Sequence, residues 1–280
     1  MSYKIIMDSC GEIPERYAGD KRFTSVPLEI EVGGYRIVDD ATLDREDLIR
    51  RIAESKTCPK SSCPSPDSYM DAYRVAEEDV YVITLSGKLS GSYNSACLGR
   101  DLFHEEVDEE KNIFVIDSQS AAGGETQIAM KIMELCEQGL AFEEVCEELT
   151  RFRDSMNTYF VLDNLDTLRK NGRLTGVKSL VASTLNIKPV MGADTGEIIQ
   201  LSQAIGVKKA LKKMVDILVK ECTEPEKKRI VINQVHARDR AEYVKELVQE
   251  ALPTIREVMI LDTSGISTMY ANEGGVIVTI

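Results

Sequence analysis

Three serines and two glycines lie close together in the segment Ser86–Tyr93. A strand-like run, Val80–Thr84, precedes this segment, and sequence compatible with a helix follows it through Leu98. At a turn from a strand into a helix, backbone N–H groups are unpaired and the helix dipole adds partial positive charge. Together with the serine hydroxyls, these groups are suited to holding an anionic oxygen group. The alternative is that a serine caps the helix and the segment binds nothing.

The segment does not match a nucleotide-binding P-loop. That pattern requires a glycine five residues before the Gly87–Lys88 pair and a serine or threonine directly after it. Val82 and Leu89 occupy these two positions. A nucleotide phosphate is therefore disfavoured as the anion.

Two enzymatic interpretations remain open from the residues alone. Ser90 would be the nucleophile of a hydrolase with His236 as its base, although the chain contains no Gly-x-Ser-x-Gly elbow. Asp8 and Asp117, each at the end of a candidate strand, would hold Mg²⁺ in a phosphatase. Cys10 stands where an aspartyl-nucleophile phosphatase would carry its second acid, so we favour the interpretation that these aspartates order loops.

Metal ions and disulfides are not expected. The two histidines, His104 and His236, are far apart in the sequence, and the seven cysteines include no Cys-x-x-Cys pair. Free thiols in a reducing compartment are the expected state.

Composition restricts the partners. The formal net charge of −13 argues against affinity for nucleic acid or for an anionic membrane surface. No run of apolar residues is long enough to span a membrane, and the first residues lack the apolar core of a signal peptide. We expect a cytoplasmic protein that binds no nucleic acid and does not insert stably into a membrane.

Strand-like runs alternate with amphipathic helical stretches through the first half of the chain, which is typical of a parallel sheet. The pattern changes near Met156, and the later apolar runs predict strands at Arg229–Gln234 and Glu257–Asp262. We therefore predict an α/β protein with two domains. Residues 1–155 would form an N-terminal α/β domain with a mainly parallel sheet, and residues 156–280 a C-terminal α+β domain with a mixed sheet. The segment around residues 61–76 is the part that could pack with the second domain.

Two further segments offer polar groups. Ser61–Pro66 is a turn-rich segment with several hydroxyls. In Asn171–Gly176, Arg173 lies between two glycines after a predicted helix, where a guanidinium would contact an anion or a partner, or remain a solvated turn residue.

In their order and spacing, these segments resemble the DegV family of bacterial fatty-acid-binding proteins over nearly the whole chain. Ser61-Ser62-Cys63-Pro64-Ser65 is similar to the family's Thr-Ser-Gln-Pro-Ser, and Ser90-Gly91-Ser92-Tyr93 to its Ser-Gly-Thr-Tyr element. The other segments that match the series are Asp8-Ser9, Val26-Pro27-Leu28, Leu168–Arg173 and Ile187-Lys188-Pro189.

The resemblance implies a lipid site between the two domains and a non-enzymatic role without cofactor or metal. A long-chain fatty acid would be held at its carboxylate by hydroxyl and backbone N–H groups, with its tail buried, and presented to a fatty acid kinase partner. A carrier of another amphiphilic lipid is the remaining binding alternative. Carried over by position, the ligand-binding residues are Ser61, Ser62, Ser90, Gly91, Ser92 and Tyr270, with Arg173 as an anion or partner contact.

Two places depart from the family pattern. Tyr270 stands where relatives commonly carry a histidine; a tyrosine donates a hydrogen bond but does not supply a histidine's proton chemistry near neutrality. Ile205 and Val207 stand where relatives often have arginines. Lipid binding is therefore better supported than a kinase partnership, and the sequence defines neither the chain length nor the saturation of the lipid.

Overall fold

A parallel four-stranded sheet forms the centre of the first half of the chain. The computed structural model, which describes residues 2–107, 111–175 and 186–280, orders its strands β2-β1-β6-β7. Strands β1 and β6 are buried almost throughout, as expected for apolar runs that are covered on both faces. The four strands are β1 (Tyr3–Asp8), β2 (Phe23–Val26), β6 (Asp79–Thr84) and β7 (Asn112–Asp117).

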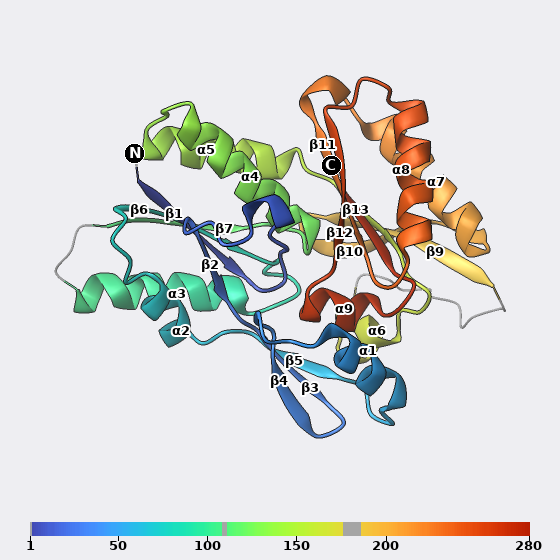
Figure 1. Cartoon of the computed structure of the whole chain (residues 1–280), viewed down its shortest axis with the longest axis horizontal. Coiled ribbons are helices and arrows are strands. Elements are labelled where there is room, and N and C mark those ends of the chain that lie inside the picture. Colours follow the sequence, from blue (N-terminus) through green and yellow to red (C-terminus); the bar gives the residue numbers. More distant parts are fainter. Residues whose placement is uncertain (1, 108–110, 176–185) are drawn as a thin grey trace.

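Helices cover both faces of this sheet (Figure 1). One face packs against α2 (Pro66–Ala72) and α3 (Ser92–Glu106), and the other against α4 (Gly123–Glu137) and α5 (Phe142–Asp154). A short 3-10 helix, η1 (Glu15–Tyr17), follows β1. This layered arrangement is the α/β fold that the alternating sequence pattern predicts.

A smaller antiparallel sheet lies beside the first, in the order β4-β3-β5 (Figure 1). Gly33 and Gly34 both have positive φ in the turn that joins β3 and β4 into a hairpin. Asp44 caps the start of helix α1, because its side chain accepts a hydrogen bond from the Asp47 N–H. These elements are β3 (Glu29–Val32), β4 (Tyr35–Val38), β5 (Lys60–Ser62) and α1 (Arg45–Glu54).

The second half of the chain forms a mixed six-stranded sheet in the order β10-β9-β8-β13-β11-β12. Only β11 and β12 pair in parallel; the other neighbours are antiparallel. The mixed sheet confirms the predicted fold class of this half. Its strands are β8 (Thr158–Val161), β9 (Ile187–Asp194), β10 (Glu197–Ile205), β11 (Arg229–Gln234), β12 (Glu257–Asp262) and β13 (Val276–Thr279).

Helices α7 (Val207–Glu221) and α8 (Arg238–Ala251) pack on one face of the mixed sheet. The two short helices α6 (Asp166–Lys170) and α9 (Gly265–Ala271) lie towards the smaller sheet (Figure 1). The 3-10 helix η2 (Pro225–Lys227) precedes β11. Helix α4 packs on strands β1 and β6 of the parallel sheet and on β11 and β13 of the mixed sheet, where Gln127 Nε2 donates to the carbonyls of Arg229 and Thr279. The division at residues 155 and 156 stays a prediction.

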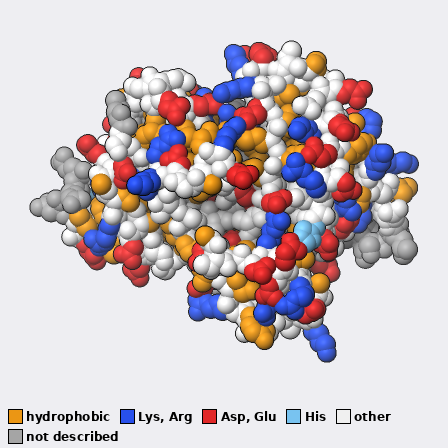
Figure 2. Space-filling view, in the orientation of Figure 1, with side chains coloured by type: hydrophobic (Ala, Val, Ile, Leu, Met, Phe, Trp, Pro, Cys, Tyr) orange, Lys and Arg blue, Asp and Glu red, His pale blue; other side chains and the backbone are white. Residues whose placement is uncertain are grey.

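Two elements differ from what the sequence pattern indicates. The segment expected to be a turn begins within strand β5, which pairs with β3. The two strands are about thirty residues apart in the sequence, so the local sequence around β5 does not indicate this pairing. Helix α9 has no counterpart among the expected elements. None of the helices that the structure describes has the length and apolarity needed to cross a bilayer. Figure 2 shows acidic and basic side chains interspersed over both halves of one face.

Candidate ligand-binding site

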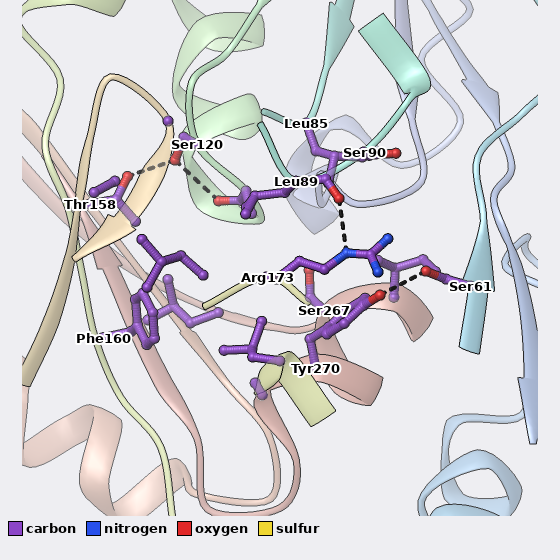
Figure 3. A pocket seen from close by; sticks show the side chains of 18 of the residues that line it. Ser61, Leu85, Leu89, Ser90, Ser120, Thr158, Phe160, Arg173, Ser267 and Tyr270 are labelled. Atoms are coloured by element: carbon purple, nitrogen blue, oxygen red, sulfur yellow. Dashed lines mark hydrogen bonds between the residues drawn. The ribbon is translucent and has the colours of Figure 1, made fainter. Parts of the chain in front are cut away.

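A cavity lies between the loops that follow β6 and β7 and the six-stranded sheet (Figure 3). About 820 Å³ of space there is not filled by atoms, a figure that includes open solvent at the mouth of the cavity. Ligands collect at this edge of a parallel sheet because the loops that follow the strands converge there. The walls are mainly apolar and come from both halves of the chain: Leu28, Leu85, Leu89, Phe160, Leu162, Leu168, Ile198, Ile266 and Ile277.

Two aspartates hold the turn that contains Ser86 to Ser92. Asp8 Oδ2 accepts hydrogen bonds from the Leu85 N–H at 2.9 Å and from Ser92 Oγ at 2.6 Å. Asp117 Oδ1 accepts from the Gly87 N–H at 3.1 Å. Asp8 is completely buried, so it is not accessible to a substrate, and both carboxylates order the loop as the favoured interpretation expects.

Four side chains form what we call the polar end of the cavity: Ser61, Ser90, Arg173 and Tyr270. Ser61 Oγ and Tyr270 Oη lie 2.9 Å apart, and the Arg173 guanidinium carbon lies 5.8 Å from the centre of the Tyr270 ring. Arg173 Nε also donates to the Leu89 carbonyl at 3.1 Å (Figure 3). Among the described residues, the acceptors that Arg173 contacts are the backbone carbonyls of Leu89 and Asn171, and neither is a carboxylate.

Helix α9 carries Tyr270 to the cavity, and Asp39 fixes the start of that helix. Asp39 Oδ1 accepts from the Gly265 N–H at 2.8 Å, and Oδ2 accepts from the Ile266 N–H at 2.9 Å and from Ser9 Oγ at 3.0 Å. A carboxylate at a helix N-terminus satisfies N–H groups that have no partner within the helix. Asp39, which directly follows strand β4, therefore helps to determine where Tyr270 stands.

Four carboxyl groups are buried at or close to the end of β1 in the folded chain: Asp8, Glu12, Asp39 and Glu125. Burial raises the pKa of Glu12 to about 8, and the nearby negative charge of Asp39 adds to the effect. Burial and then the neighbouring Asp8 carboxylate hold the pKa of Glu125 well above its usual range.

The family model for DegV proteins matches residues 2–280. The chain belongs to the DegV family. A DegV domain-containing protein of Streptococcus pneumoniae serotype 4 is 38% identical to it over 281 residues, which covers 99% of this chain and 98% of that relative.

Solved structures of DegV proteins have the same fold. A DegV family protein from Ruminococcus gnavus, refined with vaccenic acid, is 48% identical, with a TM-score of 0.97 over 100% of this chain and 99% of that one. The fatty acid kinase (Fak) B3 protein of Streptococcus pneumoniae, loaded with linoleic acid, is 36% identical, with a TM-score of 0.90 and the same coverage.

The structure of this DegV chain separates the predicted binding residues into two groups. Ser61, Ser90, Tyr270 and Arg173 line the cavity together. Ser62 is exposed, because neighbouring residues in a strand point to opposite faces. Gly91 is exposed at the start of α3, and Ser92 is fully buried.

Ser92 has a different set of partners from the one expected. Its hydroxyl lies 2.6 Å from Tyr69 Oη and donates to Asp8. Ser62, Gly91 and Ser92 are therefore not part of the cavity lining in this DegV chain, and their roles as ligand contacts stay predictions. Gly176, at the end of the Arg173 segment, lies outside the described residues.

His236 is not placed to assist Ser90. Its Nε2 lies 2.7 Å from Glu46 Oε1, and its Nδ1 lies 3.6 Å from Glu273 Oε1. It does not line the cavity, whereas Ser90 does. The structure therefore gives no support to the hydrolase alternative that pairs these two residues.

Sequence reasoning missed several polar residues of the DegV cavity. Ser120 and Thr158 line it and form a hydrogen bond of 2.7 Å, and Ser267 reaches it from α9. Ser120 follows β7 in the loop after Asp117, so its position after a strand end was the available signal. Thr158 and Ser267 carry no such signal, because their places depend on strand register and on α9.

Proposed function

We propose that this chain binds a long-chain fatty acid in the cavity, with the carboxylate at the polar end and the tail along the apolar walls. The observation that carries this proposal is the polar end itself. Three hydroxyls and a guanidinium without a described carboxylate partner stand at one side of a cavity whose walls are mainly apolar. This is the arrangement that an amphiphile with one anionic head group requires.

The energetics are favourable. Burying a tail of about sixteen carbons gains roughly 0.8 kcal/mol per CH₂, or on the order of 10 kcal/mol before the costs of ordering the ligand. A buried carboxylate would cancel much of this gain unless hydrogen-bond donors met it. Such donors are present at the polar end: the hydroxyls of Ser61, Ser90 and Tyr270 and the positively charged guanidinium of Arg173.

The relatives support the proposal. The Ruminococcus gnavus protein was refined with vaccenic acid, and the Fak B3 protein was loaded with linoleic acid. Both cover this chain fully, and the first shares almost half of its residues. A different amphiphilic lipid, such as an isoprenoid, is the second candidate, because the apolar walls alone do not select a carboxylate.

Organic extraction of the purified protein followed by mass spectrometry tests the proposal. We expect co-purifying fatty acid, or tight binding of palmitic or oleic acid after lipid removal. Replacement of Arg173 by glutamine should weaken binding of the acid more than binding of its methyl ester, because the ester carries no charge. Absence of both co-purified and added fatty acid would overturn the proposal, and recovery of a neutral lipid would favour the second candidate.

We further propose that the chain presents the bound carboxylate to a fatty acid kinase, because the Fak B3 protein, which is 36% identical to it, is named as a fatty acid kinase protein. Ile205 is exposed on β10 where relatives often carry an arginine, so the contact with a kinase would differ there. Loaded protein mixed with ATP and a bacterial fatty acid kinase subunit should yield acyl phosphate. If Fak B3 supports product formation under the same conditions and this chain does not, the kinase role is wrong while fatty acid binding stands.

A further inference from the structure

A pair of hydroxyl groups interrupts the apolar wall of the cavity on the side away from Ser61 and Tyr270 (Figure 3). Ser120 Oγ and Thr158 Oγ1 lie 2.7 Å apart, and both side chains are at least nine-tenths buried. Ser120 belongs to the loop after β7, and Thr158 is the first residue of β8. The pair is thus contributed by both halves of the chain.

The direction of Thr158 follows from the strand that carries it. Tyr159 and Val161 point into the core beneath α7, whereas Phe160 belongs to the cluster that includes cavity residues. Since side chains alternate along a strand, Thr158 points to the same side as Phe160. A valine of nearly the same shape would fill this position without a polar atom.

The pair has hydrogen-bonding capacity beyond its mutual bond. Two hydroxyls supply two hydrogens, and only one of them can lie between the two oxygens. Within the part of the chain that the structure describes, the other acceptor of the pair is the Ala121 carbonyl, 3.4 Å from Ser120 Oγ, which is a long hydrogen bond. Among the residues that the structure describes, Ser120 is the one side-chain partner of Thr158 Oγ1.

We propose that Ser120 and Thr158 form a second polar subsite that selects fatty acids with an oxygen substituent on the tail, such as hydroxy acids. This inference rests on the proposed fatty acid binding at the same cavity. A hydroxyl on the tail would exchange hydrogen bonds with Thr158 Oγ1 and Ser120 Oγ, while the carboxylate stays at the polar end. An unsubstituted tail would cover the pair with apolar atoms and leave this capacity unused.

The test compares stearic acid with hydroxystearic acids whose hydroxyl is at carbon 10, 12 or 17. Delipidated wild type and the double variant Ser120→Ala/Thr158→Val are titrated with each acid. The preference of each protein is its affinity for a hydroxy acid divided by its affinity for stearic acid. For at least one isomer we expect this preference to be about 3- to 10-fold higher in the wild type than in the variant. Thr158→Ser, which keeps the hydroxyl, should retain most of this preference.

The outcomes separate the two proposals. If neither protein binds stearic acid, the proposed fatty acid binding is wrong. Another outcome is that both proteins bind stearic acid with the same ratio of the dissociation constants for hydroxy acid and stearic acid, for every isomer. In that case the proposed subsite is wrong, and the pair only joins the two halves of the chain. Thermal unfolding of each variant shows whether it is folded, and the single variants Ser120→Ala and Thr158→Val serve if the double one is not.

Discussion

Ser61 on strand β5 and Tyr270 on helix α9 share a hydrogen bond of 2.9 Å although 209 residues separate them in the chain. The bond joins the smaller sheet to the end of the second half of the chain. Each hydroxyl also lines the cavity, so each keeps capacity for a ligand oxygen. The head-group site therefore depends on the correct relative placement of these two elements.

Replacement of Ser61 by alanine should weaken fatty acid binding about 5- to 30-fold, because the carboxylate loses one donor and Tyr270 loses its partner. Ser62→Ala is the matched control, since Ser62 is the next residue and is exposed. Fluorescent fatty acid displacement measures both affinities. Equal affinities for the two variants would mean that the carboxylate is bound elsewhere.

Ser92→Ala should lower stability rather than directly remove a ligand contact. The Ser92 hydroxyl is fully buried between Asp8 and Tyr69, and its loss leaves these groups with one partner fewer. We expect a decrease of about 1–3 kcal/mol in the free energy of unfolding in urea. Asn94→Ala, exposed in the first turns of the same helix, should change stability by much less. A Ser92 variant with native stability and abolished binding would contradict this assignment.

Gly196 in the hairpin between β9 and β10 is expected to tolerate no side chain. Its φ is +82°, and a Cβ there would lie 2.4 Å from Ser86 Oγ, which donates to the Gly196 carbonyl. Gly139 has a similar φ of +79° with open space around it, so Gly139→Ala carries the backbone strain alone, about 1 kcal/mol. Gly196→Ala should lower the unfolding temperature further than Gly139→Ala and also weaken lipid binding. Equal losses in both variants would show that the contact with Ser86 is unimportant.

Buried carboxyls with a raised pKa, about 8 for Glu12 and well above the usual range for Glu125, should make the protein less stable as pH rises from about 4.5 through the folded-state pKa. A carboxyl whose pKa is raised on folding is fully protonated in both states at low pH, but in this window only the unfolded chain releases the proton. The unfolded state then binds fewer protons, and the free energy of unfolding falls. Glu125→Gln should flatten this fall, by up to about 1.4 kcal/mol per pH unit, whereas Glu105→Gln on the surface should not. Urea unfolding at several pH values measures the slopes, and identical slopes would rule out a raised pKa for Glu125.

Local signals were sufficient for much of the fold. Strands β11 and β12 begin and end where the apolar pattern and its polar flanks place them. The glycine pair at Gly33 and Gly34 and the cap at Asp44 likewise depend only on neighbouring residues. Such features are readable because sequence neighbours supply the interactions that stabilise them.

The site was only partly predictable, for a geometric reason. Ser61 and Ser62 are equivalent as residue types, and only the register of β5 against β3 decides which one faces the cavity. Likewise, Ser90 lies before the first residue of α3 and Ser92 within it, so the start of the helix separates a cavity residue from a buried one. The position of Tyr270 depends on Asp39, which is far away in the sequence.

Because both halves of the chain supply walls of one cavity, a bound lipid would act as a removable part of the hydrophobic core. The stability of the protein would then rise with the logarithm of free lipid concentration, as for any ligand that binds only the folded state. An empty molecule would be the form most exposed to unfolding and proteolysis. The abundance of such a protein in a cell would then follow the supply of its ligand, without any dedicated sensor.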